Sequence, residues 1–243
     1  MLLHGFTGSY ARHWEATGVM QALETAGYRV IAMDCRGHGQ SGKPRDPGQY
    51  GLEMVRDVVR LLDRLNLERA HIVGYSMEGA IANQLLVRYP GRVRTVTLLG
   101  AGWEGEDLEG LTSQMLALAE GFANKDARAL IRGVMSSGQN GPTDEDVAAL
   151  NASLFTRNDP DVLAAVARGL LPLFEISATA LRATTVPVLA IIGEHDNNLE
   201  AVRRMEGVVR TLEVVEIPGA SHATSVRPSV VPLVEFLDRK RRN

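Results

Sequence analysis

A serine in the segment from Gly74 to Gly79 (GYSMEG) is the first residue whose surroundings point to chemistry. An apolar run, Ala70–Val73, precedes Ser76, and a helical pattern that runs to Tyr89 follows it. A serine at a strand-to-helix turn exposes its hydroxyl at the edge of a sheet, beside the free N–H groups that begin a helix. This placement favours a nucleophile whose oxyanion would be bound by backbone N–H groups. An ordinary N-cap serine explains the same segment equally well.

A base and an acid follow the last two predicted strands. Asp196 comes directly after the fifth strand and His222 directly after the sixth. A serine hydroxyl needs a base to become nucleophilic, and the base needs an acid that orients it. We therefore interpret Ser76, Asp196 and His222, in the chain order expected for this architecture, as nucleophile, acid and base. Glu104, after the fourth strand, is the alternative acid, and a turn aspartate with a surface histidine is the simpler explanation.

The elements that must position these residues form an alternating pattern. Short apolar runs rich in Val, Ile and Leu alternate with segments of helical period, which is typical of a parallel α/β sheet buried on both faces. The predicted strands are Met1–His4, Tyr28–Met33, Ala70–Gly74, Thr95–Leu99, Val186–Ile192 and Leu212–Ile217. The predicted helices are His13–Thr25, Leu52–Leu65, Met77–Tyr89, Glu200–Arg210 and Val230–Arg241. The fold class is therefore α/β, with a mainly parallel sheet of about six strands flanked by helices.

The alternation stops between the fourth and fifth strands. Four helical patterns stand there: Leu111–Phe122, Asp126–Met135, Thr143–Leu154 and Pro160–Leu171. Thr143 with Asp146 forms a capping signal, and Asp159 followed by Pro160 is typical of a helix start. Helices inserted at the carboxyl edge of an α/β sheet would cover the place where such sheets bind ligands. We expect residues 1–102 and 185–243 to form the core and residues 103–184 to form a helical cap, or lid.

Taken together, these segments resemble the α/β-hydrolase fold serine hydrolases over nearly the whole chain. Besides the segment around Ser76, the resemblance rests on His4–Ser9 (HGFTGS), Asp34–Ser41 (DCRGHGQS), Gly193–Asp196 (GEHD) and Gly219–His222 (GASH). It implies Ser76 as nucleophile, His222 as general base and Asp196 as its partner. It also implies an oxyanion hole from the backbone N–H groups of Phe6 and Met77. The implied activity is that of a carboxylesterase, which hydrolyses small carboxylic esters through an acyl-enzyme, while lactone, thioester and carbon–carbon bond hydrolysis stay open.

The chain departs from this family at Glu78, where the family usually has a small residue, mostly glycine. Crowding at the turn would cost about 1–3 kcal/mol. A negative charge there would also oppose the oxyanion. We therefore expect a working but impaired hydrolase, with a ligand-binding pseudoenzyme as the alternative.

A second departure concerns the sheet. The family has two further strands before the segment His4-Gly5, so Tyr28–Met33 would form an exposed edge. Exposed edges invite pairing with another chain, and we hypothesise a homodimer through this edge.

The predicted cap supplies candidate substrate contacts. The expected substrate-binding residues are Tyr75, Trp103, Met115, Phe122, Phe155 and Phe174. For most of the apolar side chains in the cap, packing onto the core is the simpler role. A cap without strong charge favours a short or medium apolar ester over a phosphorylated substrate.

Composition and net charge exclude several other classes of protein. Of the 243 residues, 45% are hydrophobic and 23% are charged, which excludes a disordered chain and a coiled coil. The net charge of −3 argues against nucleic acid as a partner, and the basic run Arg239–Arg242 fits a helix C-terminus. The single cysteine, Cys35, excludes an internal disulfide and favours a reduced thiol in the cytoplasm.

No targeting or cofactor motif stands out. We find no apolar stretch of about 18 residues and no basic-then-apolar N-terminal signal, so no membrane partner is expected. The histidines show no metal-ligand spacing, no segment has a phosphate-loop pattern, and we predict neither metal nor cofactor. His4 is expected to brace the loop that carries Phe6 rather than to react.

Overall fold

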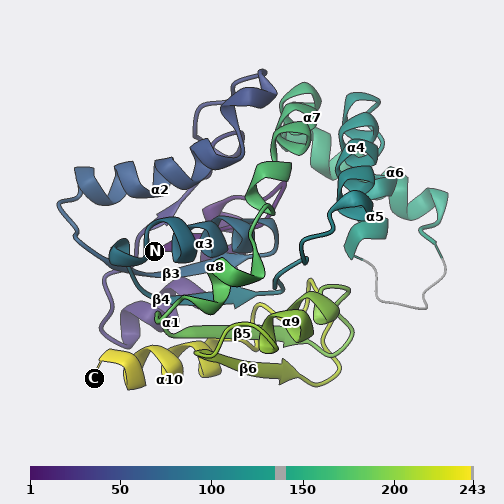
Figure 1. The fold of residues 1–243 in the computed structure, drawn as a ribbon. Coiled ribbons are helices and arrows are strands. Elements are labelled where there is room, and N and C mark those ends of the chain that lie inside the picture. The colour runs from purple at the N-terminus through teal and green to yellow at the C-terminus, as the bar shows by residue number, and fades with distance from the viewer. Residues whose placement is uncertain (135–140, 242–243) are drawn as a thin grey trace.

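The computed structural model describes residues 1–134 and 141–241 and contains one parallel sheet (Figure 1). Six strands lie in the order β2-β1-β3-β4-β5-β6, and every neighbouring pair is parallel. The strands are β1 (Leu2–Leu3), β2 (Ala32–Met33), β3 (Ala70–Tyr75), β4 (Val93–Leu99), β5 (Val188–Gly193) and β6 (Leu212–Ile217). The predicted α/β fold with a six-stranded parallel sheet is confirmed.

Helices cover both faces of this sheet. They are α1 (Val19–Thr25), α2 (Leu52–Arg64), α3 (Met77–Arg88), α8 (Ala178–Arg182), α9 (Leu199–Glu206) and α10 (Val230–Arg241). One core cluster joins the sheet to α2, α3, α8 and α9 through side chains such as Leu62, Ile81 and Met205. A second cluster on the opposite face includes Leu23 of α1 and Phe236 of α10. Burial on both faces explains why the strands are continuously apolar.

Several predicted bounds are wrong for identifiable reasons. The helix expected at His13–Thr25 is a π-helical turn, η1 (Ala11–Glu15), followed by α1, because Gly18 between them adopts φ of +82°. The strand expected at Tyr28–Met33 is only two residues long, since its single neighbour β1 also has two. Strand β5 begins after Pro187, which has no N–H to donate to a ladder. Helix α9 ends at Glu206, before Gly207.

In the described chain five α-helices lie between β4 and β5, and the first four of them gather at the upper right of Figure 1. They are α4 (Glu109–Ala123), α5 (Arg128–Val134), α6 (Asp144–Arg157) and α7 (Pro160–Gly169). Leu118, Phe122, Leu154 and Leu163 form a small core of their own there. The predicted capping box of Thr143 and Asp146 is confirmed. Met135, the expected end of the second helix, lies outside the described residues, and the cap boundaries at 103 and 184 stay a prediction.

Short 3₁₀ turns complete the element list: η2 (Pro47–Gln49), η3 (Pro90–Arg92) and η4 (Leu171–Leu173). Among the described helices, none is by itself long and apolar enough to cross a bilayer. Helix α7 and the segment Leu171–Arg182 reach that length only as a pair bent by 44°.

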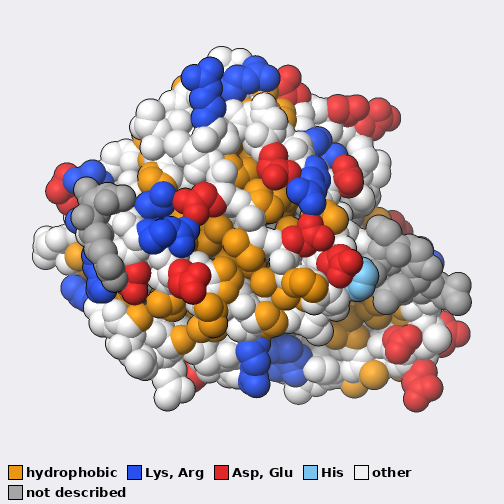
Figure 2. Space-filling view, turned by 90° about the horizontal axis from the view of Figure 1, so that it is seen from below, with side chains coloured by type: hydrophobic (Ala, Val, Ile, Leu, Met, Phe, Trp, Pro, Cys, Tyr) orange, Lys and Arg blue, Asp and Glu red, His pale blue; other side chains and the backbone are white. Residues whose placement is uncertain are grey.

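The two edges of the sheet differ. Strand β6 lies on the side that Figure 2 views, where hydrophobic side chains are bordered by acidic and basic ones. Glu213 and Glu216 of β6 form ion pairs with Lys240 at 2.9 Å and Arg203 at 2.8 Å. Charged side chains discourage edge-to-edge pairing. Strand β2, at the other edge, is short and made of Ala32 and Met33.

Candidate active site

Ser76 occupies a strained turn between β3 and α3. Its φ of 57° and ψ of −126° are rare for a residue with a side chain, and such strain persists only where the surroundings enforce it. The Ser76 N–H donates to Leu99 O of β4 at 2.8 Å, and the Gly79 N–H donates to Ser76 O at 2.8 Å. These bonds fix the turn at the carboxyl end of the sheet.

Two glycines leave the space that this turn needs. A Cβ on Gly74 would lie 2.5 Å from the backbone oxygen of Glu78, and a Cβ on Gly79 would lie 2.3 Å from the Cβ of Ala101. Both distances are far below normal contact, so α3 packs this closely on β3 and β4 only because both residues lack a side chain.

The structure brings the three predicted residues into one hydrogen-bonded chain. His222 Nε2 lies 2.8 Å from Ser76 Oγ. His222 Nδ1 lies 2.9 Å from Asp196 Oδ2 and 3.1 Å from Oδ1. Because a carboxylate only accepts, Nδ1 carries the proton and Nε2 is free to accept the Ser76 hydroxyl proton. Asp196 and His222 are both 5% exposed, so this chain is shielded from bulk water.

The carboxylate of Asp196 is itself held in place. It accepts the Asn198 N–H at 2.9 Å, and the Asn198 side chain donates to Gly100 O at 2.8 Å. Glu104, the alternative acid, has a different partner, since Arg204 Nη2 lies 3.4 Å from its carboxylate. Burial raises the pKa of Glu104 above its ordinary value, and the nearby Arg204 opposes that shift. The acid that meets His222 is therefore Asp196.

The ring of His222 rests on Tyr75. The two rings are stacked, with centroids 5.2 Å apart and planes 23° from parallel. The Tyr75 hydroxyl donates to His222 O at 3.1 Å, and burial raises the pKa of this phenol. Tyr75 was expected to contact substrate, but it is buried behind the histidine, where it fixes the ring.

Two backbone N–H groups complete the arrangement. The N–H groups of Phe6 and Met77 have no acceptor within the described part of the chain. Phe6 and Met77 line the same cavity as Ser76. An N–H group that faces a cavity with its hydrogen bond unmade is suited to bind an oxyanion.

The cavity above Ser76 has a volume of about 720 Å³. Of the six expected substrate-binding residues, Met115 and Phe174 line it. The other four pack elsewhere. Trp103 Nε1 donates to Ile176 O at 2.9 Å. Phe122 is fully buried and lies edge-on to Phe6 at 5.4 Å, and Phe155 lies edge-on to Phe122 at 6.4 Å.

The cavity wall also holds polar residues that sequence reasoning missed. They are Gln114, Glu120, Asn124, Asp126, Arg128, Arg132, Asn197 and Asn198, and they lie beside Glu104, the alternative acid of the sequence analysis. The expectation of a cap wall without strong charge is therefore corrected. A sequence signal existed for Asn197 and Asn198, which directly follow Asp196 at the end of a predicted strand. None existed for α4 and α5, whose solvent-facing and cavity-facing polar positions look alike.

Glu78 is buried away from the cavity wall. Its side chain is fully buried, its Oε1 lies 4.0 Å from His4 Nδ1, and neither carboxyl oxygen has a hydrogen-bond partner in the described ranges. Burial raises the pKa of Glu78 well above its ordinary value. Burial therefore favours the neutral form of this carboxyl, and a neutral carboxyl would not oppose an oxyanion.

Cys35 lies beside Glu78. The Cys35 N–H donates to His4 Nε2 at 3.0 Å, and the thiol is buried. Burial, together with the nearby Glu78 and Asp34, raises the pKa of Cys35 well above its ordinary value. Such a thiol stays protonated and unreactive. Across residues 1–134 and 141–241, no group of three or more His, Cys, Asp or Glu is arranged to hold a metal.

A parallel sheet with a Ser-His-Asp chain at its carboxyl edge defines the α/β hydrolase class. The sequence profile of the alpha/beta hydrolase fold family matches residues 1–225, and the chain belongs to this family.

Individual curated proteins match shorter stretches. A 2-hydroxy-6-oxononadienedioate/2-hydroxy-6-oxononatrienedioate hydrolase of Paraburkholderia phymatum is 40% identical over 106 residues, which is 43% of this chain and 36% of that protein. Bifunctional epoxide hydrolase 2 of Sus scrofa is 36% identical over 99 residues, which is 40% of this chain and 17% of that protein. The chain spans between 17% and 37% of the length of the curated relatives it matches.

Solved structures match the whole fold. A structure from a study of carboxylesterases of Nitrososphaera gargenis has a TM-score of 0.79 and 21% identity, and the match covers 99% of this chain and 90% of that one. MenH from S. aureus has a TM-score of 0.77 and 18% identity, with 99% and 93% covered. At these identities the likeness concerns the fold alone.

Proposed function

We propose that this chain is a serine hydrolase that cleaves small carboxylic esters through an acyl-enzyme intermediate. The observation that carries the proposal is the hydrogen-bonded chain from Ser76 Oγ to His222 Nε2 at 2.8 Å and from His222 Nδ1 to Asp196 at 2.9 Å. A hydroxyl, an imidazole and a carboxylate in this order are what nucleophilic attack on an acyl carbon requires.

The reaction would begin when Ser76 Oγ bonds to the acyl carbon and its proton passes to His222 Nε2. The carbonyl electron pair moves onto oxygen, where the Phe6 and Met77 N–H groups stabilise the charge. Asp196 stabilises the imidazolium through Nδ1. When the tetrahedral intermediate collapses, the ester C–O bond breaks and His222 gives its proton to the departing alcohol. Water then repeats the sequence on the acyl-enzyme and releases the acid.

The cavity wall supports an acyl group of modest size. Met77, Met115, Leu118, Leu170 and Phe174 supply the apolar side of the lining, in the cavity that Ser76 also lines. Pockets that bind small molecules combine an apolar lining with a few placed polar groups. We propose a short or medium acyl chain on this apolar side.

The test uses p-nitrophenyl butyrate and a fluorophosphonate probe on the wild type and on Ser76→Ala. Hydrolysis and labelling that both disappear in the variant support the proposal. Stoichiometric binding of ligands by a wild type that neither hydrolyses nor labels would support the pseudoenzyme instead.

A second candidate is hydrolysis of a carbon–carbon bond in a substrate that carries a carboxylate. Arg132 in the cavity wall favours it, because a guanidinium group binds carboxylates, and the Paraburkholderia phymatum relative is named for a dioate substrate. Assaying a vinylogous 1,5-diketone bearing a carboxylate beside the butyrate ester separates the two. A kcat/KM that is higher for the diketone would displace the ester assignment.

For the whole protein we propose a cytoplasmic homodimer that pairs through β2. Support comes from the position of β2 at one edge of the sheet, where Ala32 and Met33 carry no charge. A monomeric mass by light scattering would overturn the dimer.

A further inference from the structure

We infer that His13 is a positioning residue that aims the Phe6 N–H at the oxyanion. This inference rests on the proposed function, because it assigns a role to a residue beside the same site. His13 lies on η1, outside every segment that identified the site from the sequence.

The direction of the Phe6 N–H depends on the Gly5 carbonyl. In a planar trans peptide the carbonyl oxygen of one residue and the N–H of the next point in opposite directions. Gly5 O accepts from His4 Nδ1 at 2.9 Å and from the Gly8 N–H at 3.1 Å. His4 Nε2 accepts the Cys35 N–H, so the His4 proton must be on Nδ1. Two donors on the far side of the peptide therefore aim the Phe6 N–H toward the cavity.

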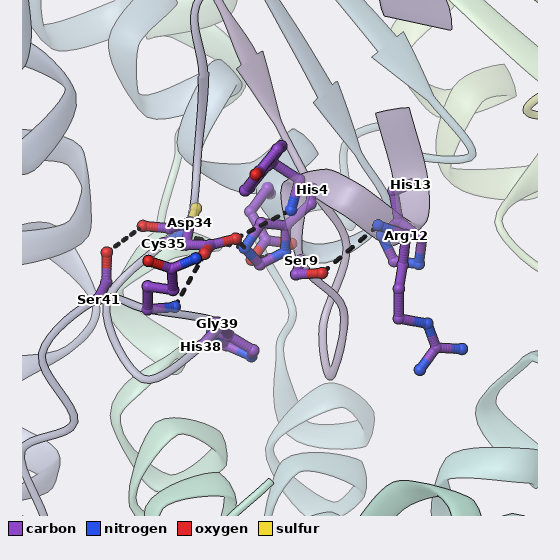
Figure 3. A network of polar contacts seen from close by, with 12 residues as sticks. His4, Ser9, Arg12, His13, Asp34, Cys35, His38, Gly39 and Ser41 are labelled. Carbon is purple, nitrogen blue, oxygen red and sulfur yellow. Dashed lines mark hydrogen bonds and ion pairs between the residues drawn. The ribbon is translucent and has the colours of Figure 1, made fainter. Parts of the chain in front are cut away.

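His13 contacts the N–H group of Gly5, opposite the carbonyl that His4 and Gly8 bind. The Gly5 N–H donates to His13 Nδ1 at 3.0 Å. A nitrogen that accepts a hydrogen bond carries no proton, so His13 is neutral with its proton on Nε2. Burial, with smaller effects of His4, Arg12 and His222, lowers the pKa of His13 to about 4, in agreement with this neutral form. Figure 3 shows His13 with His4 and the surrounding polar network.

The loop leaves room for this ring. A Cβ on Gly8 would lie 2.3 Å from His13 Cε1, so the ring reaches Gly5 only because Gly8 has no side chain. A Cβ on Gly5 would lie 2.8 Å from the Tyr75 ring. The loop therefore fits between His13 and Tyr75 with no spare space.

His13 also ties the oxyanion loop to the base. Its ring lies edge-on to Tyr75, with centroids 5.0 Å apart, and the Tyr75 ring stacks on His222 at 5.2 Å. A single tyrosine thus contacts the ring that orients Gly5 and the ring that takes the Ser76 proton. These contacts connect the loop that carries the Phe6 N–H to the ring of His222.

The experiment compares three variants with the wild type on p-nitrophenyl butyrate. His13→Leu removes the acceptor, whereas His13→Asn places Oδ1 where Nδ1 stood and keeps it. His71→Leu is the matched control, because His71 is a partly buried histidine with one side-chain hydrogen bond, to Thr95 at 2.9 Å, at the opposite end of β3.

If the Phe6 N–H no longer points at the oxyanion, the transition state is less well stabilised, so kcat should fall while KM stays nearly unchanged. We expect His13→Leu to lower kcat about 10- to 100-fold, less than the loss of a whole oxyanion donor. His13→Asn should return kcat to within about fivefold of the wild type, and His71→Leu should leave it unchanged. Wild-type kcat in a folded His13→Leu, or equal loss in His13→Asn and His13→Leu, would overturn the inference.

A measurement on the unaltered protein covers the case in which His13→Leu does not fold. Nitrogen NMR of ¹⁵N-histidine-labelled wild type should show His13 with an unprotonated, hydrogen-bonded Nδ1 and a protonated Nε2. The opposite tautomer would overturn the inference. Failure of the proposed function is distinguishable, because it would appear as a wild type that neither hydrolyses the ester nor takes the fluorophosphonate label.

Discussion

The rim where β3, β5 and β6 end and the four helices α4 to α7 are built in different ways. At the rim, backbone hydrogen bonds and close contacts hold the proposed catalytic residues. The Ser76 N–H donates to Leu99 O, and Tyr75 holds His222 through its ring and its hydroxyl. The four helices are instead held together by side chains that pack into a small core of their own. Ion pairs such as Arg128 of α5 with Asp144 of α6 at 2.9 Å join these helices, and exposed pairs of this kind contribute little stability.

This difference separates reactivity from selectivity. A substitution at the rim should displace one of the proposed reacting atoms, because the close contacts of the glycines there leave no space for a side chain. A change on α4 or α5 alters the wall of the cavity while the rim stays in place. The rim should therefore tolerate few substitutions, and the helices should tolerate many.

The largest effect is expected for Asp196→Asn, which keeps the shape of the rim but can donate to His222. An amide that donates would favour the tautomer with the proton on Nε2, which cannot accept from Ser76. We expect kcat to fall about 10⁴-fold with little change in melting temperature. Glu104→Gln is the control, and a comparable loss there would move the acid to Glu104. The measurement is steady-state ester hydrolysis together with thermal unfolding.

A smaller but still large effect is expected for Gly100→Ala. Gly100 has φ of +58°, and a Cβ would lie 3.0 Å from the His222 ring and 3.1 Å from Asp196 Oδ2. The substitution should lower kcat about 10- to 100-fold and cost about 1–3 kcal/mol of unfolding free energy.

Gly110 of α4 supplies the matched substitution on the helices. Nothing lies within 4 Å of a Cβ at Gly110. We expect Gly110→Ala to keep wild-type kcat and to gain about 0.4–1 kcal/mol of stability in urea unfolding. Equal losses in the two variants would contradict the proposed difference between rim and helices.

Glu78→Gln tests the neutral carboxyl beneath the rim. In the unfolded chain Glu78 ionises above its ordinary pKa of 4.5, while burial raises this pKa in the folded state. The folded wild type then binds more protons and loses stability as pH rises, by up to about 1.4 kcal/mol per pH unit. Glutamine does not titrate, so its advantage over the wild type should grow from about pH 5 to about pH 7. Urea unfolding across this range that shows a constant difference would mean that Glu78 is ionised in the fold.

The smallest effects are expected in the cavity wall. Phe174→Ala and Met115→Ala remove apolar contact with the acyl chain, and each should raise KM for the butyrate ester about 3- to 10-fold while kcat changes little. Phe155→Ala is the control, since Phe155 packs on Phe122 and does not line the cavity. If Phe155→Ala raises KM as much as Phe174→Ala, the acyl chain lies deeper among the helices than we propose.

The rim was predictable from the sequence because strand ends are visible in it. Ser76, Asp196 and His222 each follow an apolar run, and parallel strands bring their carboxyl ends to one edge. The cavity wall was less predictable. An apolar residue at helical spacing shows that a helix has a buried face, but not whether that face meets the cavity, as Met115 does, or the core of the helices, as Phe122 does.

The apolar pattern also failed to predict some of the local backbone geometry. The apolar period through residues 13–25 continues across Gly18, although its positive φ separates η1 from α1. That break gives η1 its own direction, and His13 lies on η1 beside Gly5. Nothing in the composition of the segment indicates that a backbone N–H eight residues away, that of Gly5, needs an acceptor. The side-chain direction of Glu78 was equally invisible, because the turn can place it toward the cavity or beneath the sheet.

The burial of Cys35 has a practical consequence. It is the only cysteine among the 243 residues, it is 1% exposed, and its N–H bonds to the histidine that supports the Gly5 loop. A thiol-reactive dye can reach this sulfur only when the Gly5 loop and its surroundings move away from Cys35. The rate of dye attachment in native buffer would therefore report how often this movement occurs, and no additional cysteine has to be introduced.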